Sequence, residues 1–362
     1  MYICSENDQK PNFMKGDKPS ILLIYTGGTI GMIENENTGT LENFNFERLI
    51  EYIPEVQKLN HNISAYSFDP PMDSSDLEPS AWVTLAKIID ENYDRYDGFV
   101  ILHGTDTMAY TASALSFMLE NLNKAVILTG SQLPIGMLRT DGKENLITSI
   151  EIAGAKNENG TSMVPEVCIF FENRLLRGNR TTKIHAENFS AFRSFNYPSL
   201  AEAGIHIKYN TTFIRKPTQK KLVIHDQFDP NVVVLTLFPG LQEEIVRSVL
   251  HVKGIKAMVL KTYGSGNAPQ KEWLIRELKE AIDRGIVIVN VTQCPAGAVE
   301  MDRYETGIQL LKIGVTSGHD STSECAITKL MFLLGQGFSP EKVRELMETD
   351  LAGELTEHAH NT

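Results

Sequence analysis

The chain has 362 residues, of which 42% are hydrophobic and 22% are charged, and its formal net charge at pH 7 is −12. These values are ordinary for a globular protein with a sizeable core, and the length predicts two domains. The acidic balance argues against nucleic acid and against an anionic membrane as partners, because either would require a basic surface.

The N-terminal segment and the cysteines give no sign of export or of a metal. Residues 1–20 are polar and lack the apolar core of a signal peptide, so we expect an N-terminal tail and a cytoplasmic protein. No run reaches the length of a membrane span, and we expect no membrane partner. Cys4, Cys168, Cys294 and Cys325 lie far apart without CxxC spacing, which indicates reduced thiols and argues against zinc. We expect no metal and no cofactor.

Apolar runs alternate with helical patterns along the first half of the chain. The runs typical of buried strands are "ILLIY" (21–25), "GFVILH" (98–103), "AVILTG" (125–130) and "EVCIFF" (166–171). Helices are expected over Pro79–Tyr93, Thr107–Leu122 and Asp141–Ala155. This alternation predicts a parallel sheet with helices on both faces.

A polar, basic stretch bracketed by prolines, at 209–230, is typical of a connection between domains, although its "KLVIH" segment could add a strand. Beyond it, strands are expected at 232–237, 255–263 and 285–292, with helices over Glu272–Arg284 and Ser323–Leu334. We therefore predict two α/β domains with parallel-rich sheets. The larger, doubly wound N-terminal domain covers 21–208, the linker covers 209–230, and the smaller C-terminal domain covers 231–362.

Two of the predicted strands end in glycine-containing turns that carry threonine. These turns are "YTGGTIGM" (25–32) and "HGTDTMAY" (103–110). Ligands bind beyond the carboxyl ends of strands in open parallel sheets, and glycine lets the backbone approach them closely. The turns lack the Gly-Lys-Ser/Thr ending and the glycine spacing of nucleotide-binding loops. Taken alone, Thr29 is more often a helix cap or turn residue than a nucleophile, and Thr105 and Asp106 have the same interpretation.

The joint pattern is more informative than either turn. Together with "MDSSD" (72–76) and "RGNRTTKIHA" (177–186), the two turns resemble the signatures of the asparaginase/glutaminase family. The stretches "TYGSGNAPQ" (262–270), "TQCPAGAVEMDRYETG" (292–307) and "TSECAITKL" (322–330) resemble its cytoplasmic, type I branch. The resemblance runs from about Ile21 to Thr356.

The resemblance implies an L-asparagine amidohydrolase that yields L-aspartate and ammonia through a threonine acyl-enzyme intermediate, with weaker glutaminase activity. It implies Thr29 as the nucleophile, with Thr105, Asp106 and Lys183 as a relay. A lysine near a carboxylate can carry a proton to or from a hydroxyl. Whether the relay activates Thr29 or the water that clears the intermediate stays open.

Two further features concern the surroundings of Thr29. Tyr304 is the candidate for a phenol that hydrogen-bonds Thr29, because the loop 32–46, which supplies a tyrosine in some family members, contains none here. A half-buried tyrosine at a helix start is an equally good interpretation. The polar loop 31–41 is expected to be a lid, or else a passive hairpin. We interpret His103 as structural, since the relay is complete without it.

Substrate selection requires groups for an α-carboxylate and an α-ammonium. By resemblance, Ser74 matches the position that binds the carboxylate, and Asp106 has the charge that suits the ammonium. Gly28, Ser75 and Ser131 are candidates for supplementary donors. For the serines, a capping role in a loop is the alternative.

Members of this family form dimers or tetramers, so the resemblance implies a homodimer or homotetramer. In such an assembly Asn267 could reach the active site of a neighbouring subunit. Some type I enzymes also bind asparagine at a regulatory site. Thr182 matches that site, but Lys261 stands where an arginine would be, which removes one bidentate carboxylate contact. Allosteric activation stays open.

Two other functions remain as alternatives. One is the glutaminase-like subunit of a tRNA-dependent amidotransferase, but its added N-terminal domain is not recognisable here and the net charge of −12 disfavours a polyanion. The other is a non-catalytic amino-acid sensor. A sensor predicts a broken relay position, whereas the chain carries the residues of the relay at all its positions.

Overall fold

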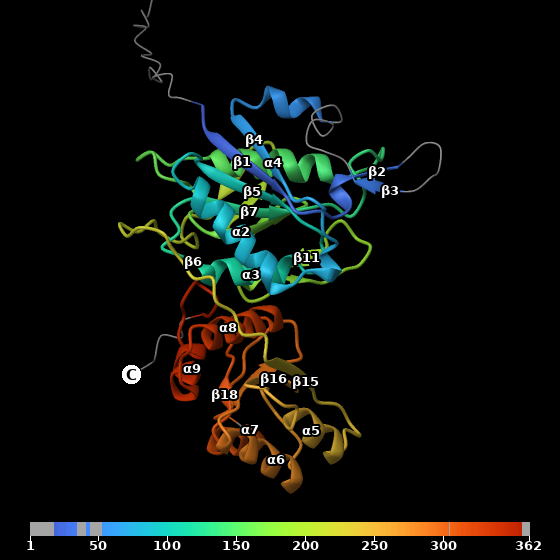
Figure 1. Cartoon of the computed structure of the whole chain (residues 1–362), viewed down its shortest axis with the longest axis vertical. Coiled ribbons are helices and arrows are strands. Elements are labelled where there is room, and N and C mark those ends of the chain that lie inside the picture. The colour runs from blue at the N-terminus through green and yellow to red at the C-terminus, as the bar shows by residue number, and fades with distance from the viewer. Residues whose placement is uncertain (1–17, 35–40, 44–52, 304, 357–362) are drawn as a thin grey trace, which may run out of the picture.

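A computed structural model describes residues 18–34, 41–43, 53–303 and 305–356. Two main sheets lie toward opposite ends of an elongated molecule (Figure 1). The larger has eight strands in the order β13-β12-β9-β8-β7-β5-β1-β4, and the smaller has four in the order β15-β16-β17-β18. The predicted α/β fold, with a larger N-terminal and a smaller C-terminal part, is confirmed.

Five neighbouring strands of the large sheet are parallel. They are β4 (Asn62–Ser67), β1 (Ser20–Tyr25), β5 (Gly98–Leu102), β7 (Ala125–Thr129) and β8 (Val167–Phe171). The sheet continues through β9 (Arg174–Arg177), β12 (Ala201–Ala203) and β13 (Ile207–Tyr209), each antiparallel to its neighbour. This antiparallel edge was not predicted, because strands of three or four residues are too short to show a period.

Helices cover both faces of the large sheet, as predicted. Ile21 and Leu23 of β1 face α4 (Gly142–Gly154), whereas Leu22 and Ile24 face the opposite layer. That layer consists of α2 (Pro79–Asn92) and α3 (Met108–Met118). Because successive strand residues point to opposite faces, the uninterrupted apolar run of β1 supplies both cores.

One predicted helix is too long. The expected helix over Thr107–Leu122 ends at Met118, because the next two residues form β6 (Leu119–Glu120) and pair with β14 (Val223–Ile224). The strand expected within the linker is thus present, and the two-stranded sheet that it forms with β6 contacts α2 and α3. The proposed domain boundaries stay predictions.

The smaller sheet is entirely parallel and is also covered on both faces. Its strands are β15 (Val232–Thr236), β16 (Ala257–Thr262), β17 (Val287–Thr292) and β18 (Thr316–Ser317). Its helices are α5 (Glu243–Leu250), α6 (Glu272–Asp283), α7 (Glu305–Lys312), α8 (Ser323–Gly335) and α9 (Pro340–Met347). The sequence predicted α6 and α8. It missed α5, α7 and α9, which have eight residues each.

Short strands and 3₁₀ helices lie in the segments that connect these longer elements. They are η1 (Thr29–Gly31), β2 (Met32–Glu34), β3 (Leu41–Asn43), η2 (Pro54–Lys58), η3 (Ser74–Asp76), η4 (Gly178–Arg180), β10 (Thr182–Lys183) and β11 (Phe192–Arg193), where η denotes a 3₁₀ helix. Within the described ranges, no helix is both long and apolar enough to cross a bilayer.

The two halves of the molecule are packed together through α3 and α8 (Figure 1). The rings of Phe117 and Phe332 stack there with centroids 5.8 Å apart. The last described segment returns from α9, and Lys329 of α8 binds Glu354 of this segment, with its Nζ 2.6 Å from Oε1. Both side chains are almost fully buried.

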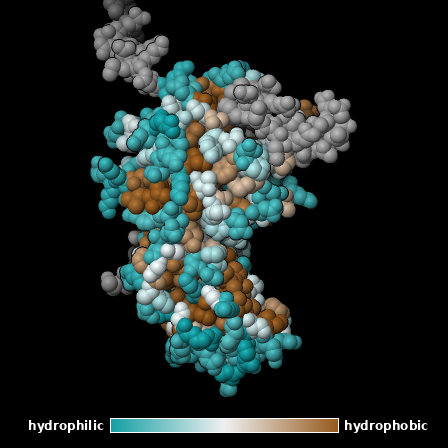
Figure 2. All heavy atoms as spheres, in the orientation of Figure 1, coloured by the Kyte–Doolittle hydropathy of each residue, from teal (hydrophilic) through white to brown (hydrophobic). Residues whose placement is uncertain are grey.

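Apolar side chains also gather on the outer surface of the C-terminal half, as Figure 2 shows. Exposed large apolar residues of that half include Val234 on β15, Phe238, and Ile245 on α5. Contiguous apolar surface of this kind is typical of contact sites for other proteins.

The buried ion pair predicts a large loss of stability when one partner is removed. Burial alone would raise the pKa of Glu354, but Lys329 beside it holds that pKa below its ordinary value. We expect Lys329→Met to lower the free energy of unfolding by about 3–5 kcal/mol, because it leaves a carboxylate buried without its cation. The measurement is urea unfolding at pH 7.

The matched control for this experiment is Lys342→Met, which removes an exposed pair with Glu345. It should cost less than about 1 kcal/mol. Equal losses in the two variants would contradict the assignment of stability to the buried pair.

Candidate active site

The carboxyl ends of β1, β5 and β7 meet at one edge of the large sheet, where the two threonine-bearing turns touch. Gly28 has φ +91°, and a Cβ placed on it would lie 2.6 Å from both Cα and N of Gly104. A side chain at residue 28 would therefore collide with backbone that cannot move aside. The contact places Thr29 and Thr105, the next residue in each turn, at neighbouring positions.

Thr29 is the first residue of η1 and is half-buried. The turn is fixed from inside by buried Ile30 and by Tyr25, whose hydroxyl donates to the carbonyl of Gly31 over 3.3 Å. Burial raises the pKa of Tyr25 to about 12, so this phenol stays protonated at neutral pH. The backbone of the turn is thus held while the Thr29 side chain lies near the surface.

Lys183 joins the second turn through its amine. Its Nζ lies 2.8 Å from Thr105 Oγ1 and 2.7 Å from Asp106 Oδ1. The lysine comes from β10, which pairs with β11, and its side chain is only 19% exposed, whereas that of Asp106 is 63% exposed. The fold therefore brings together the three predicted relay residues from two distant segments.

The loop that carries the predicted carboxylate-binding serine lies against the second turn. A Cβ on Gly104 would lie 2.4 Å from Ser74 Oγ, and Thr107 Oγ1 donates to the carbonyl of Ser74 over 2.7 Å. Ser74 is buried. Ser75 is exposed, and both its N–H and its hydroxyl donate to Asp73 Oδ1. The geometry of Ser75 is therefore that of a capped turn, the alternative that the sequence left open.

Ser131 follows β7 at the same edge and is buried. Its hydroxyl donates to the carbonyl of Leu133 over 2.5 Å. A Cβ on Gly142 would lie 3.2 Å from atoms of both Ile30 and Ser131, so Ser131 lies beneath the turn of Thr29. Its hydroxyl hydrogen is used within the protein, and its oxygen can still accept a bond.

His103 is buried behind the site and both of its ring nitrogens have partners. Nδ1 lies 2.7 Å from the carbonyl of Gly104 and must donate to it, so Nε2 accepts from Thr111 Oγ1 at 2.9 Å. Thr111 in turn accepts from the indole N–H of Trp82. This chain of bonds suits a neutral imidazole, and burial lowers the pKa of His103 to about 4. The structural interpretation of His103 agrees with this geometry.

Two predictions fall wholly or partly outside the described residues. Tyr304 lies outside them, so its proposed bond to Thr29 stays a prediction. Of the predicted lid over 31–41, the structure describes the start and the last residue, where β2 pairs antiparallel with β3. This pairing is compatible with a lid and with a hairpin.

The predicted regulatory residues lie in separate sheets. Thr182 of β10 donates to Glu324 Oε1 over 2.5 Å, and Glu324 lies in the first turn of α8. Lys261 lies in β16, where its carbonyl accepts from the side chain of Gln293. Asn267 accepts from Thr306 Oγ1 over 2.6 Å, and its reach toward a neighbouring chain is untested.

Sequence reasoning missed the contacts that hold the Lys183 segment. Arg177 and Arg180 both donate to the carbonyl of Gly353, and Arg180 also pairs with Asp320 at 2.9 Å. A second buried pair joins Arg177 to Glu166 at 2.6 Å. The signal in the sequence was the regular spacing of Arg174, Arg177 and Arg180, three residues apart, shortly before Lys183.

Comparison with known proteins gives matches along most of the chain. The family model described as "Asparaginase, N-terminal" matches residues 20–215, and that described as "Glutaminase/Asparaginase C-terminal domain" matches residues 231–347. L-asparaginase 1 of Escherichia coli (strain K12) is 47% identical over 340 residues, which are 94% of this chain and 98% of that protein.

Two further matches cover the same 94% of this chain. The 60 kDa lysophospholipase of Mus musculus is 42% identical over 366 residues, and the match spans 63% of its length. The crystal structure of L-asparaginase I from Vibrio cholerae has a TM-score of 0.85 and 44% identity, with 100% of that chain covered.

The buried imidazole predicts a pH dependence of stability. The pKa of His103 is about 4 in the native protein, below its ordinary value of 6.5. As the pH falls below 6.5, the unfolded chain takes up a proton that native His103 refuses until about pH 4. Stability is therefore lost over this window, by up to roughly 3 kcal/mol. Urea unfolding at pH 7.5 and pH 4.5 measures the loss.

The variant His103→Gln removes this titration, so its loss of stability between the two pH values should be smaller than that of the wild type. The titration of carboxylates contributes equally to the loss of stability in both proteins. The difference between the two losses therefore reports the imidazole of His103. Identical losses would show that His103 does not titrate below its ordinary range.

Proposed function

The chain belongs to the asparaginase family and is an amidohydrolase, and from this membership we propose that it hydrolyses L-asparagine to L-aspartate and ammonia. The observation that supports the proposal most strongly is the position of the Lys183 amine. It lies between the hydroxyl of Thr105 and the carboxylate of Asp106, beside the turn that carries Thr29. Relatives named L-asparaginase in bacteria, an archaeon and a nematode support the same substrate.

In the proposed reaction, the Thr29 hydroxyl oxygen attacks the side-chain amide carbon. The carbon–nitrogen bond then breaks, the nitrogen takes up a proton and leaves as ammonia, and an ester to Thr29 remains. Water attacks this ester, releases L-aspartate and restores the hydroxyl. Splitting the hydrolysis in this way replaces one difficult step by two easier ones.

The relay handles the protons of these steps. A threonine hydroxyl is a poor nucleophile at neutral pH, so a group must take its proton as the bond to carbon forms. We assign this role to the hydroxyl of Thr105, with Lys183 as the amine that accepts the proton and Asp106 as the carboxylate that orients the amine. The same groups return a proton to the departing nitrogen.

Recognition of the free amino acid follows from charge and position. Asp106 is a negative group at the edge of the site and is assigned to the α-ammonium, and Ser74 and the N–H of Gly28 are assigned to the α-carboxylate. Ser75 and Ser131 are supplementary, since both hydroxyls already have partners in the protein. The proposed mechanism uses no metal and no cofactor.

Assembly, location and regulation are further proposals. A homodimer or homotetramer is supported by the apolar surface of the C-terminal half. A cytoplasmic location is proposed from the likeness to the type I branch of the family. Weaker glutaminase activity is proposed because the one methylene by which glutamine exceeds asparagine changes binding by only about 1–3 kcal/mol.

A regulatory asparagine site at Thr182 and Lys261 would be supported by a sigmoidal dependence of the rate of ammonia release on the concentration of L-asparagine.

Replacement of the proposed nucleophile should abolish turnover. We expect Thr29→Ala to lower kcat for ammonia release from L-asparagine by at least about 10³-fold, because no hydroxyl remains to form the ester. The control Thr84→Ala removes an exposed helical threonine and should leave kcat unchanged. L-glutamine and a lysophospholipid are tested alongside. Full activity of Thr29→Ala would refute the nucleophile, and lysophospholipid hydrolysis without ammonia release would refute the substrate.

The relay should behave as one unit. Lys183→Met and Thr105→Val should each lower kcat by about 10²–10⁴-fold, since each removes a step of the same proton path. The double variant should then be little worse than either single variant. Steady-state kinetics on folded samples, checked by circular dichroism, provide the comparison. Multiplicative losses would mean that the two groups act independently.

A further inference from the structure

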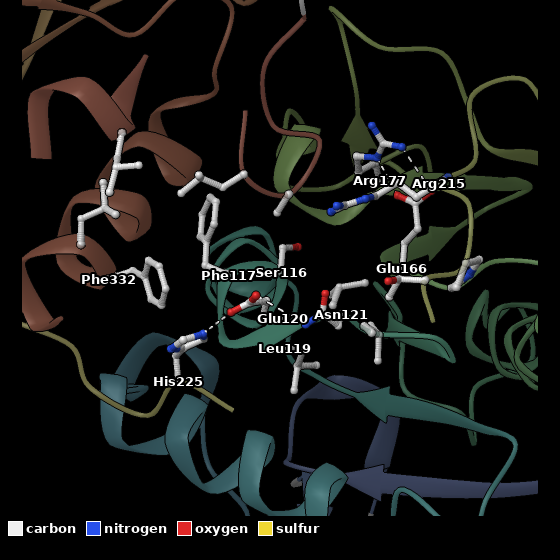
Figure 3. A pocket seen from close by; sticks show the side chains of 18 of the residues that line it. Ser116, Phe117, Leu119, Glu120, Asn121, Glu166, Arg177, Arg215, His225 and Phe332 are labelled. Atoms are coloured by element: carbon white, nitrogen blue, oxygen red, sulfur yellow. Dashed lines mark hydrogen bonds and ion pairs between the residues drawn. The ribbon is translucent and has the colours of Figure 1, made fainter. Parts of the chain in front are cut away.

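A cavity of about 570 Å³ lies between the two halves of the molecule (Figure 3). It is bordered by residues just before β7 and β8, among them Leu122 and Glu166. These are the amino ends of the parallel strands, whereas the candidate active site is at their carboxyl ends. The cavity is therefore a separate space, and its size lies within the range of small-molecule sites.

One end of the cavity is apolar and aromatic. Phe117 from the last turn of α3 and Phe332 from α8 form its stacked wall, with Leu333, Leu346 and Leu351 around them. The five side chains come from α3, α8, α9 and the segment after α9. This end can bury an aromatic or aliphatic body, because it offers ring faces and methyl groups from several sides.

The two acidic residues that line the cavity already have partners in the protein. Glu120 Oε2 lies 2.7 Å from His225 Nε2, and Glu166 forms the buried pair with Arg177 at 2.6 Å. The remaining lining charges are those of Arg215 and Lys216, both exposed. Neither takes part in an ion pair among the described residues. With His225 counted as neutral, the lining residues carry three positive and two negative charges, so the balance of the cavity is positive.

The charged rim and the aromatic wall are at different ends. In Figure 3, Arg215 and Arg177 lie on one side, Phe332 and His225 lie on the other, and Phe117 lies between them. A ligand that reaches both must be elongated. The electrostatic influence of Arg215 also reaches the carboxyl of Asp350, which does not line the cavity. Because Asp350 offsets part of the charge of the two cations Arg215 and Lys216, a monoanion fits this end better than a dianion.

We propose that this cavity binds a monocarboxylate with an elongated apolar body. The carboxylate contacts Arg215 and Lys216, and the body lies along Phe117 toward Phe332. This function is additional to amide hydrolysis, since the proposed substrate is small, carries both charges of an amino acid and binds at the opposite edge of the sheet.

Isothermal titration calorimetry with 4-phenylbutyrate tests the proposal on the full chain. We expect saturable binding of the carboxylate, with the neutral analogue 4-phenylbutanol at least about tenfold weaker because it lacks the charge-assisted contacts. Acetate, which lacks the apolar body, should also bind at least about tenfold more weakly. Equal affinity for the acid and the alcohol would overturn the assignment of the cationic end, and an absence of saturable binding would overturn the site.

Variants locate the binding. Arg215→Ala should weaken binding by about tenfold or more, whereas Arg174→Ala, at an exposed arginine outside the cavity, should not change it. Ser116→Phe should block the middle of the cavity, because Ser116 lines it there and its hydroxyl donates to the helix carbonyl of Ala112. Ser248→Phe is its control, since the exposed Ser248 makes the same kind of bond within α5, to the carbonyl of Glu244.

A change at the candidate active site separates the two sites. Thr105→Val should bind 4-phenylbutyrate as the wild type does, while Ser116→Phe should release ammonia from L-asparagine normally. If Thr105→Val abolished binding and Ser116→Phe did not, the probe would occupy the active site and the proposal would be wrong. The binding result does not depend on which amide the enzyme hydrolyses.

Discussion

The contact between the backbones of Gly28 and Gly104 is the constraint on which the candidate active site depends. Neighbouring parallel strands bring their carboxyl ends to one edge, but ordinary side chains in the two turns would hold the turns apart. With glycine in both places, the turns touch, and each glycine is followed directly by a threonine. The distance between Thr29 and Thr105 is thus set by a contact between two backbone segments. Such a contact is more rigid than one between side chains, which can change rotamer.

The amine of the relay is positioned by the other half of the molecule. Lys183 follows a segment in which Arg177 and Arg180 bind the carbonyl of Gly353, and Thr182 donates to Glu324 at the start of α8. All these partners belong to the C-terminal part of the chain. The N-terminal sheet supplies the edge on which the site is built, and the C-terminal part fixes the strand that brings the lysine to it.

Helix α3 connects the two sites discussed here. Its first turn follows Thr105 and Asp106, and its last turn supplies Phe117 to the wall of the cavity between the halves. The helix is buried on nearly all sides, against the large sheet and against α8. Such a helix has low amphipathicity because both of its sides face protein.

The sequence by itself determined the alternation of strands and helices, the two glycine-containing turns and the family to which their residues point. It could do so because a buried parallel strand is a continuous apolar run, and because the turns consist of adjacent residues. It also supplied Thr29, Thr105, Asp106 and Lys183 as candidates, through motifs that are local.

Only the tertiary structure decided what those residues touch. The 2.8 Å contact between Lys183 and Thr105 joins residues 78 positions apart, and the Arg180–Asp320 pair joins residues still more distant. The antiparallel edge of the large sheet, the early end of α3 at Met118 and the cavity between the halves likewise arise from contacts between distant segments. A sequence pattern records the period and chemistry of neighbours along the chain, whereas these features depend on which distant neighbours the packing of two sheets brings together.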